Sequence, residues 1–311
     1  MPTRRAAPAT RIESPEALAR ALAPTYIADA RAALSAWLAL ELGRPLLVEG
    51  PAGVGKTDLA RALAQTLSRP LVRLQCYEGL DEAKALYEWD YAKQMLYTQL
   101  LRDSVAAETA GAGSIAEAVD RLAGAESAFF GKRFMTARPL LQVIESEVPA
   151  VLLVDEVDRA DPEFEAFLLE ILAENQVTIP ELGTLRAVHP PLVVLTTNAT
   201  RDMTDALRRR CLHLFLDYPP PSRELAILEL RVPGIAKDLA DALVRFVHAV
   251  RDLELRKAPS IAETIDWARA LVLLGASALD KDLVASTLGV LVKHQEDLRK
   301  VETALPKLLR P

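Results

Sequence analysis

The stretch "GPAGVGKT", Gly50 to Thr57, limits the possible folds of this chain more than any other feature. It matches the pattern GxxxxGK[ST], in which glycines let the backbone curl so that its N–H groups face an anion at the start of a helix. The apolar run "RPLLVEG" precedes it, and the helical pattern "DLARALAQTLS" follows it. A phosphate-binding loop between a buried strand and a helix is therefore predicted.

Five short apolar runs, separated by helical patterns, are predicted to be strands. Strands that alternate with helices favour βαβ units and a parallel sheet covered on both faces. The runs are Arg44–Gly50, Leu71–Cys76, Ala150–Glu156, Leu192–Asn198 and Leu212–Asp217. We expect an α/β fold with a five-stranded parallel P-loop sheet sandwiched by helices, followed by an all-α domain.

Composition shifts divide the chain into three predicted parts. Residues 1–14 are polar and Pro-rich and are expected to be a disordered arm, residues 15–218 the α/β domain, and residues 219–311 the helical domain after the prolines Pro219–Pro221. An insertion is expected at about residues 77–140, with an Ala-rich helical part at 103–128, and a hairpin at 176–188.

The helix after Asp161 and Pro162 is predicted to be amphipathic, with Asp161 as its cap. Its apolar stripe is Phe164, Phe167, Leu168, Ile171 and Leu172. Its opposite, polar face is expected to carry Glu163, Glu165, Glu170 and Glu174.

Charge and composition argue against two classes of partner, nucleic acid and membrane. The 311 residues carry a net charge of −6, which argues against a nucleic-acid binder, although a local basic patch would be enough for one. No run of 18 apolar residues occurs, so no membrane partner is expected. Two cysteines, Cys76 and Cys211, fit a reducing compartment. We expect a cytoplasmic protein.

The phosphate loop points to ATP and Mg²⁺ as cofactors. Lys56 is expected to reach the β- and γ-phosphates and the Thr57 hydroxyl to ligate Mg²⁺. An ordinary Gly-rich turn is the bland alternative, and the flanking strand and helix argue against it. The predicted cofactor-binding residues are Gly50, Pro51, Ala52, Gly53, Val54, Gly55, Lys56, Thr57 and Asp58.

The segment "VLLVDEVDRAD" supplies a carboxylate pair at the end of a predicted strand, where α/β sheets bind ligands. Asp155 is expected to hold Mg²⁺, and Glu156 to orient and polarise the attacking water. The alternative, a pair that caps the next helix, is weaker because Asp161 already stands at that cap. Asn198, at the end of "LVVLTTN", could position the same water.

Three arginines, Arg208, Arg209 and Arg210, directly precede the last predicted strand. Arginine is seldom buried without a partner. They could solvate a loop end, bind nucleic acid or contact an anionic group. Nucleic-acid binding is only weakly supported, because no aromatic residues that could stack on bases lie near the three arginines.

The order of these motifs resembles the AAA+ ATPases over about residues 20 to 300. The wording "VDEVDRADPEFEAFLLEILAENQVTIPE" and "TTNATRDMTDALRRRC" is similar to the MoxR group. Within that group, "RLQCYEGLDEAKALYEWDYAKQ" and "RKAPSIAETIDWARAL" resemble the subgroup associated with maturation of carbon monoxide dehydrogenase and related molybdenum hydroxylases.

The resemblance implies a ring, usually a hexamer, with ATP between subunits and a helical lid. It implies a chaperone-like motor that remodels a client metalloenzyme for metal insertion, and a partner with a von Willebrand A domain. The hairpin at 176–188 would be the pre-sensor insertion of this clade. Tyr26 and Ile27 would lie near the adenine, although such a pair is more often part of a core.

The resemblance also assigns a role to the arginines. Arg209 or Arg210 would complete the ATP site of the neighbouring subunit as a finger, since guanidinium is always charged and binds phosphate oxygens in pairs. Arg208 is expected to be exposed or at an interface. Arg159 is a second interface candidate, or else pairs with Asp158 or Asp161.

One position departs from the family pattern. Many AAA+ proteins carry an arginine at the start of a lid helix, where this chain has Ser260, Ile261 and Ala262. Arg256, Lys257 or Arg269 could replace it. Trp89 and Tyr91 are expected to pack within the insertion, and the alternative is an exposed role in binding a partner.

Two further functions remain open from the sequence alone. One is a motor stimulated by nucleic acid, such as a restriction-type translocase, against which the acidic charge argues. The other is a nucleotide-gated scaffold with low turnover, against which the intact Lys56, Asp155 and Glu156 argue.

Overall fold

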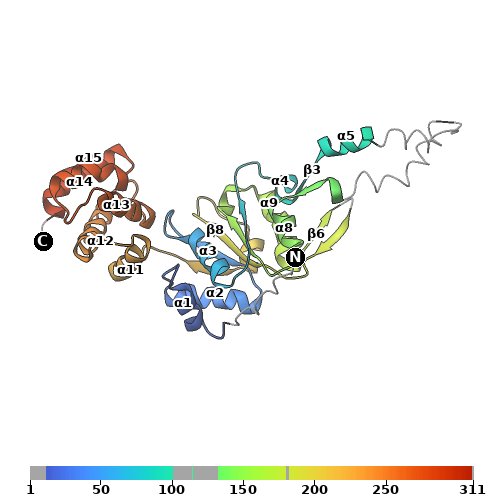
Figure 1. Cartoon of the computed structure of the whole chain (residues 1–311), viewed down its shortest axis with the longest axis horizontal. Coiled ribbons are helices and arrows are strands. Elements are labelled where there is room, and N and C mark those ends of the chain that lie inside the picture. Colours follow the sequence, from blue (N-terminus) through green and yellow to red (C-terminus); the bar gives the residue numbers. More distant parts are fainter. Residues whose placement is uncertain (1–11, 101–113, 115–131, 180–181, 310–311) are drawn as a thin grey trace.

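The fold is known from a computed structural model of the chain, which describes residues 12–100, 114, 132–179 and 182–309. The parallel sheet lies at the centre of Figure 1, with the C-terminal helices to one side and the strand β3 (Tyr87–Trp89) to the other. The Ala-rich stretch at 103–128, apart from residue 114, lies outside the described residues.

The central sheet has five parallel strands in the order β2-β5-β8-β1-β9, which confirms the predicted fold class. Strand β5, the third of the five along the chain, is buried along its whole length. Such strands read as continuous apolar runs because helices cover both of their faces. The bounds are β1 Leu46–Glu49, β2 Leu71–Gln75, β5 Val151–Asp155, β8 Leu192–Thr197 and β9 Leu212–Phe215.

Helices pack on both faces of this sheet and build two separate cores. Alternate residues of β1 show the division, since Leu46 and Val48 belong to one core and Leu47 to the other. The first core contains α1 Pro15–Leu22, α2 Ala30–Leu42 and α3 Lys56–Thr66. The second contains α4 Glu82–Leu86, α8 Pro139–Ile144, α9 Pro162–Glu174 and α10 Asp205–Arg210.

The predicted insertion holds a small antiparallel sheet. Strands β3 Tyr87–Trp89 and β4 Met135–Ala137 pair, with α5 Tyr91–Leu100 after β3 and the short helix η1 Lys132–Phe134 before β4. The Trp89 ring contacts Tyr87 edge to face. Tyr91, by contrast, is 70% exposed, so the expectation that it packs in the insertion is wrong.

The segment after α9 forms a second antiparallel pair. Strands β6 Gln176–Ile179 and β7 Gly183–Arg186 align Gln176 with Arg186. Val177 and Ile179 of β6 are buried in the core below α9. This pair lies where the sequence predicts a hairpin.

Helix α9 has the predicted apolar stripe, but its polar face contains one exception. Glu165, expected on the solvent side, is fully buried. Its carboxylate accepts hydrogen bonds from the Arg201 guanidinium and from the Thr204 backbone N–H. The predicted cap Asp161 stands at the N-terminus of α9 but makes no capping hydrogen bond there, and accepts one from Gly79 N–H instead.

The chain after β9 is helical in its described part. The helices are α11 Pro221–Arg231, α12 Lys237–Arg251, α13 Ile261–Leu273, α14 Lys281–Leu291 and α15 Gln295–Leu308. They enclose a third core around the buried Trp267. The capping box of Ser260 and Glu263 predicted at the start of α13 is present.

The N-terminal arm becomes ordered earlier than expected. The Trp37 indole N–H donates to the Ile12 carbonyl, and the Ser14 hydroxyl caps α1. Residues 12–14 are therefore not part of a disordered arm, and residues 1–11 lie outside the described residues. No helix among the described residues is long and apolar enough to span a membrane.

Candidate nucleotide site

A cavity of about 340 Å³ opens beside the carboxyl ends of β1, β5 and β8. Because parallel strands end at the same edge of a sheet, residues distant in the sequence meet there. The lining also includes residues from α11 and α13, so the C-terminal helices form one wall. The predicted site residues in the lining are Ala52, Gly53, Val54, Gly55, Lys56, Thr57, Asp58, Asp155, Glu156 and Asn198.

The phosphate loop is shaped by neighbours that leave no room for side chains. A Cβ on Gly50 would clash with the Leu216 carbonyl, and one on Gly53 would clash with the Ser260 hydroxyl. Gly53 and Gly55 have φ of 76° and 97°, which residues with a Cβ rarely adopt. The loop is therefore a backbone cradle ahead of α3, as an anion site requires.

The Lys56 side chain makes hydrogen bonds to the backbone of this loop and to Asn198. Its amine donates to the Gly50 and Pro51 carbonyls at 2.6 and 2.8 Å and to Asn198 Oδ1 at 2.8 Å. Burial lowers the pKa of this amine, and the carboxylates of Asp158, Asp155 and Glu156 oppose that shift. The structure thus brings together Lys56 and Asn198, which are 142 residues apart.

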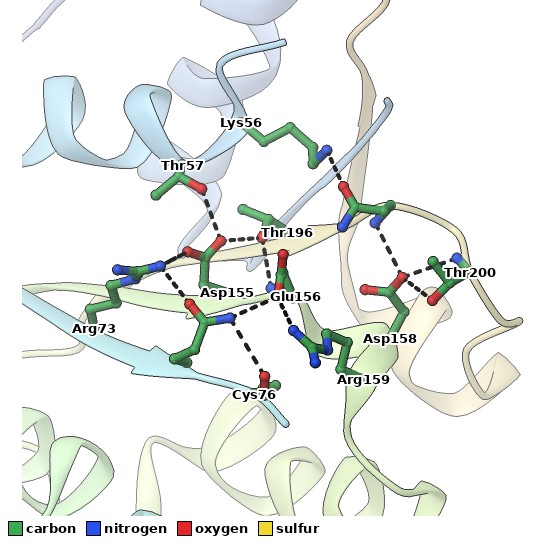
Figure 2. Close-up of polar contacts among 12 residues, drawn as sticks. Lys56, Thr57, Arg73, Cys76, Asp155, Glu156, Asp158, Arg159, Thr196 and Thr200 are labelled. Atoms are coloured by element: carbon green, nitrogen blue, oxygen red, sulfur yellow. Dashed lines mark hydrogen bonds and ion pairs between the residues drawn. The ribbon is translucent and has the colours of Figure 1, made fainter. Parts of the chain in front are cut away.

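Asp155 is the buried carboxylate of the site, at the end of β5. Its Oδ1 accepts from the Thr57 hydroxyl at 2.9 Å and from the Thr196 hydroxyl at 2.6 Å (Figure 2). Its Oδ2 accepts from the Arg73 guanidinium, with 3.0 Å to Nε. Thr57 and Asp155, the two predicted Mg²⁺ ligands, are therefore adjacent.

The donor set fits Mg²⁺. A hydroxyl and one carboxylate are hard oxygen ligands, and Mg²⁺ commonly uses one or two carboxylates together with substrate phosphates and water. No group of three or more His, Cys, Asp or Glu side chains that could hold a metal gathers within the described part of the chain. The Thr57–Asp155 pair therefore suits a metal that arrives with a phosphate ligand.

Glu156 follows directly and has an unusual backbone. Its φ of 56° is in the left-handed region, which commonly marks functional sites when a non-glycine residue adopts it. Its Oε2 accepts from Gln75 Nε2 at 2.9 Å and from Arg159 Nη1 at 3.0 Å. Of the two alternatives for Arg159, pairing with Asp158 or Asp161 is wrong, because Arg159 instead bonds this carboxylate (Figure 2), and the interface role stays a prediction.

Asp158 fixes the loop that carries Asn198, a role that the sequence did not reveal. Its Oδ2 accepts from the backbone N–H groups of Asn198 and Thr200, at 3.3 and 3.0 Å, and from the Thr200 hydroxyl at 2.7 Å. Burial would raise the pKa of Asp158, but these hydrogen bonds outweigh it and hold the pKa below its usual value.

The arginine segment is the last turn of α10. Arg209 and Arg210 are exposed, and their backbone carbonyls accept hydrogen bonds from Arg44. Arg208 is only half-exposed and lies 3.8 Å from the Glu49 carboxylate at the end of β1. The side chain is thus less exposed than expected, because it turns toward its own phosphate-loop strand, and the expected interface role of Arg208 stays a prediction.

The helical wall reaches the site through two arginines that the sequence did not single out and through the start of α13. Arg231 pairs with Asp58 at 2.8 Å, and Arg223 pairs with Asp29. The Ala262 N–H donates to the Gly53 carbonyl at 3.2 Å. These contacts hold α11 and the start of α13 against the phosphate-loop side of the cavity.

The three residues considered as substitutes for a lid arginine take other positions. Lys257 pairs with Glu263 at 3.6 Å, and Arg269 with Asp266 at 3.5 Å. The Arg256 N–H donates to Asp297. Arg223 and Arg231, rather than these three, line the cavity among the described residues.

Tyr26 and Ile27 lie in the lining, on the side of α2. Burial is the main cause that raises the pKa of the Tyr26 hydroxyl, and it therefore stays neutral. Ile227, Leu230 and Ile265 line the same cavity and add apolar surface to it. A flat, apolar group attached to phosphates would fit there.

A phosphate loop ahead of α3, a carboxylate pair after β5 and a polar residue after β8 define a P-loop ATPase of the α/β class. Residues 45–211, more than half of the chain, match the family model described as "AAA domain (dynein-related subfamily)". The chain belongs to this family, which confirms the predicted AAA+ ATPase of MoxR type.

Three relatives show how far the similarity extends. The gas vesicle ATPase GvpN of Ancylobacter aquaticus is 25% identical over 247 residues, which are 76% of this chain and 63% of that protein. Protein NorQ of Paracoccus denitrificans is 24% identical, over 68% of this chain and 66% of that protein. The chaperone protein ClpB 2 of Thermosynechococcus vestitus is 30% identical, over 49% of this chain but only 13% of that protein.

Proposed function

We propose that this protein is a Mg²⁺-dependent ATP hydrolase whose turnover drives the remodelling of a partner protein. One observation carries the proposal. Lys56, Thr57, Asp155, Glu156 and Asn198, which come from three separate segments, converge on one cavity at the carboxyl edge of the sheet. Family membership supports the same chemistry.

The residue roles follow from this arrangement. The loop N–H groups and Lys56 bind the phosphates, and Thr57 and Asp155 hold Mg²⁺, which neutralises charge on the transferring phosphoryl group when it is bound. Glu156 orients the attacking water and accepts its proton once its carboxylate is free of Gln75 and Arg159. Asn198, held by Asp158, positions the same water.

A ring, expected to be a hexamer, would complete the site with Arg209 or Arg210 of a neighbouring subunit. Both side chains are exposed at the end of α10, while the Arg44 contacts fix their backbone. An exposed guanidinium held on a fixed backbone can reach an anion on an adjacent molecule. Members of this family typically assemble as rings, which supports the proposal.

The client would be a protein, in keeping with the name of the chaperone relative. The segments Arg73–Gln94 and Arg256–Leu271 support the narrower proposal that the chain acts in the cytoplasm, in maturation of a molybdenum hydroxylase such as carbon monoxide dehydrogenase. A protein with a von Willebrand A domain would be its partner.

The hydrolytic role is tested by Glu156→Gln. The amide keeps the size of the side chain but cannot accept the water's proton, so we expect phosphate release to fall on the order of 10²-fold or more. The affinity for a fluorescent ATP analogue, measured by equilibrium titration, should stay within about threefold. An unchanged rate of phosphate release would favour a nucleotide-gated scaffold.

The same variant tests the client. A tagged Glu156→Gln chain with ATP and Mg²⁺ should retain its partner, because the ATP-bound state cannot turn over. We expect a molybdenum hydroxylase subunit and a von Willebrand A protein to be enriched over a tagged Lys56→Ala chain. Absence of both, together with mature hydroxylase in a host that lacks this chain, would contradict the maturation proposal.

A further inference from the structure

Arg73 occupies one side of the buried carboxylate that is proposed to hold Mg²⁺. Its Nε and Nη2 lie 3.0 and 2.5 Å from Asp155 Oδ2, and its Nη2 also bonds the Gln75 side chain. The Asp155 side chain is 4% exposed, while that of Arg73 is 44% exposed. Figure 2 shows the guanidinium reaching Asp155 from the neighbouring strand β2.

The other oxygen of Asp155 is also engaged by the chain. Its Oδ1 accepts hydrogen bonds from the hydroxyls of Thr57 and Thr196. A carboxylate buried to this degree is costly unless it is paired and hydrogen-bonded, and Arg73 supplies the cation that pairs with it. Both oxygens of Asp155 are thus satisfied without a metal.

Mg²⁺ would bind the Asp155 carboxylate through its negative charge, and Arg73 already pairs with that charge. Two cations on one carboxylate repel each other, and a guanidinium at 2.5 Å from Oδ2 leaves that oxygen no room for a metal. We propose that Arg73 is an internal counterion that competes with Mg²⁺ for Asp155 and so sets the Mg²⁺ concentration needed for nucleotide binding. The inference rests on the proposed Mg²⁺–ATP site.

The geometry indicates which partner can move. Asp155 is fixed at the end of β5, an interior strand, where its carbonyl accepts from Cys76 N–H and the residues before it pair with β2 and β8. Arg73 stands on β2, at the edge of the sheet, with a long, partly exposed side chain in the cavity lining. The guanidinium can therefore leave Asp155 without disturbing the backbone.

The test measures binding rather than turnover. The full chain is titrated with MgCl₂ at a fixed concentration of a fluorescent, non-hydrolysable ATP analogue, and the Mg²⁺ midpoint is recorded. In Arg73→Met the competitor is gone, so we expect the midpoint to fall by roughly tenfold, in line with loss of a charged hydrogen-bonded pair. Arg73→Lys keeps the positive charge but loses the bidentate guanidinium, so its Mg²⁺ midpoint should lie between those of the parent and Arg73→Met.

Arg138→Met is the matched control. Its side chain is 45% exposed and pairs with Glu88, away from the site, so its midpoint should equal that of the parent. Thermal melting without Mg²⁺ adds an independent readout. Arg73→Met should melt below both the parent and the control in EDTA, because Asp155 is left buried and unpaired, and Mg²⁺ with the analogue should remove most of this difference.

The outcomes separate the two proposals. A midpoint for Arg73→Met equal to or above that of the parent would overturn the counterion role. If Arg73→Met does not fold, an unchanged midpoint in Arg73→Lys overturns it equally. If the parent itself binds the analogue without any dependence on Mg²⁺, the proposed Mg²⁺–ATP site fails, and with it the basis of this inference.

Discussion

At the scale of single residues, the phosphate loop is defined by what its glycines contact. Gly53 lies against Ser260 and Ala262 at the start of α13, and its carbonyl accepts the Ala262 N–H. The loop and the helical domain therefore share one contact at the point where nucleotide would bind. A side chain at position 53 would separate them.

Gly53→Ala tests this contact. The added Cβ would clash with the Ser260 hydroxyl, so the loop or α13 must shift, and we expect ATP affinity in an equilibrium titration to fall by about tenfold or more. Gly79→Ala is the matched control, because Gly79 has nearly the same φ, +75° against +76°, but nothing within 4 Å of its Cβ position. Equal losses in both variants would mean that backbone strain alone is responsible.

At the scale of elements, the sequence predicted the sheet well, because buried parallel strands are continuous apolar runs. Each of the five runs contains one observed strand, and Lys56, Thr57, Asp155 and Glu156 follow from motif and position. The partners of these residues could not be predicted in the same way. Arg73 and Gln75 meet the carboxylates only because β2 pairs with β5, with Gln75 aligned to Asp155.

Helix α9 shows a second limit of the sequence pattern. Helical periodicity placed Glu165 on the polar face, yet it is buried because the loop between β8 and α10 packs over it. Arg201 and Thr204 of that loop supply the hydrogen bonds that a buried carboxylate needs. Periodicity describes one element, whereas burial depends on which other element lies on top of it.

At the scale of the whole molecule, the site is bounded by two structural units. The α/β part supplies the carboxylates of Asp155 and Glu156, and the helices after β9 supply one wall, joined to it through the Arg223–Asp29 and Arg231–Asp58 pairs. Arg209 and Arg210 are not among the residues that line this cavity in their own chain.

Because Arg209 and Arg210 do not line the cavity of their own chain, we propose that one of them completes the site of a neighbouring subunit. The most direct measurement is ATP hydrolysis in rings mixed from two inactive chains, Lys56→Ala and the double variant Arg209→Ala/Arg210→Ala. The double variant alone should bind ATP but hydrolyse it at least about 10³-fold more slowly.

In the mixed rings, some interfaces pair an intact Lys56 with intact arginines. We predict that hydrolysis recovers with mixing, reaching a clear fraction of the parent rate at equal proportions. Mixed assembly must be verified independently, for example by two different tags on the two chains. Verified mixed rings that remain as inactive as either variant alone would contradict the claim and leave the arginines as a solvated helix end.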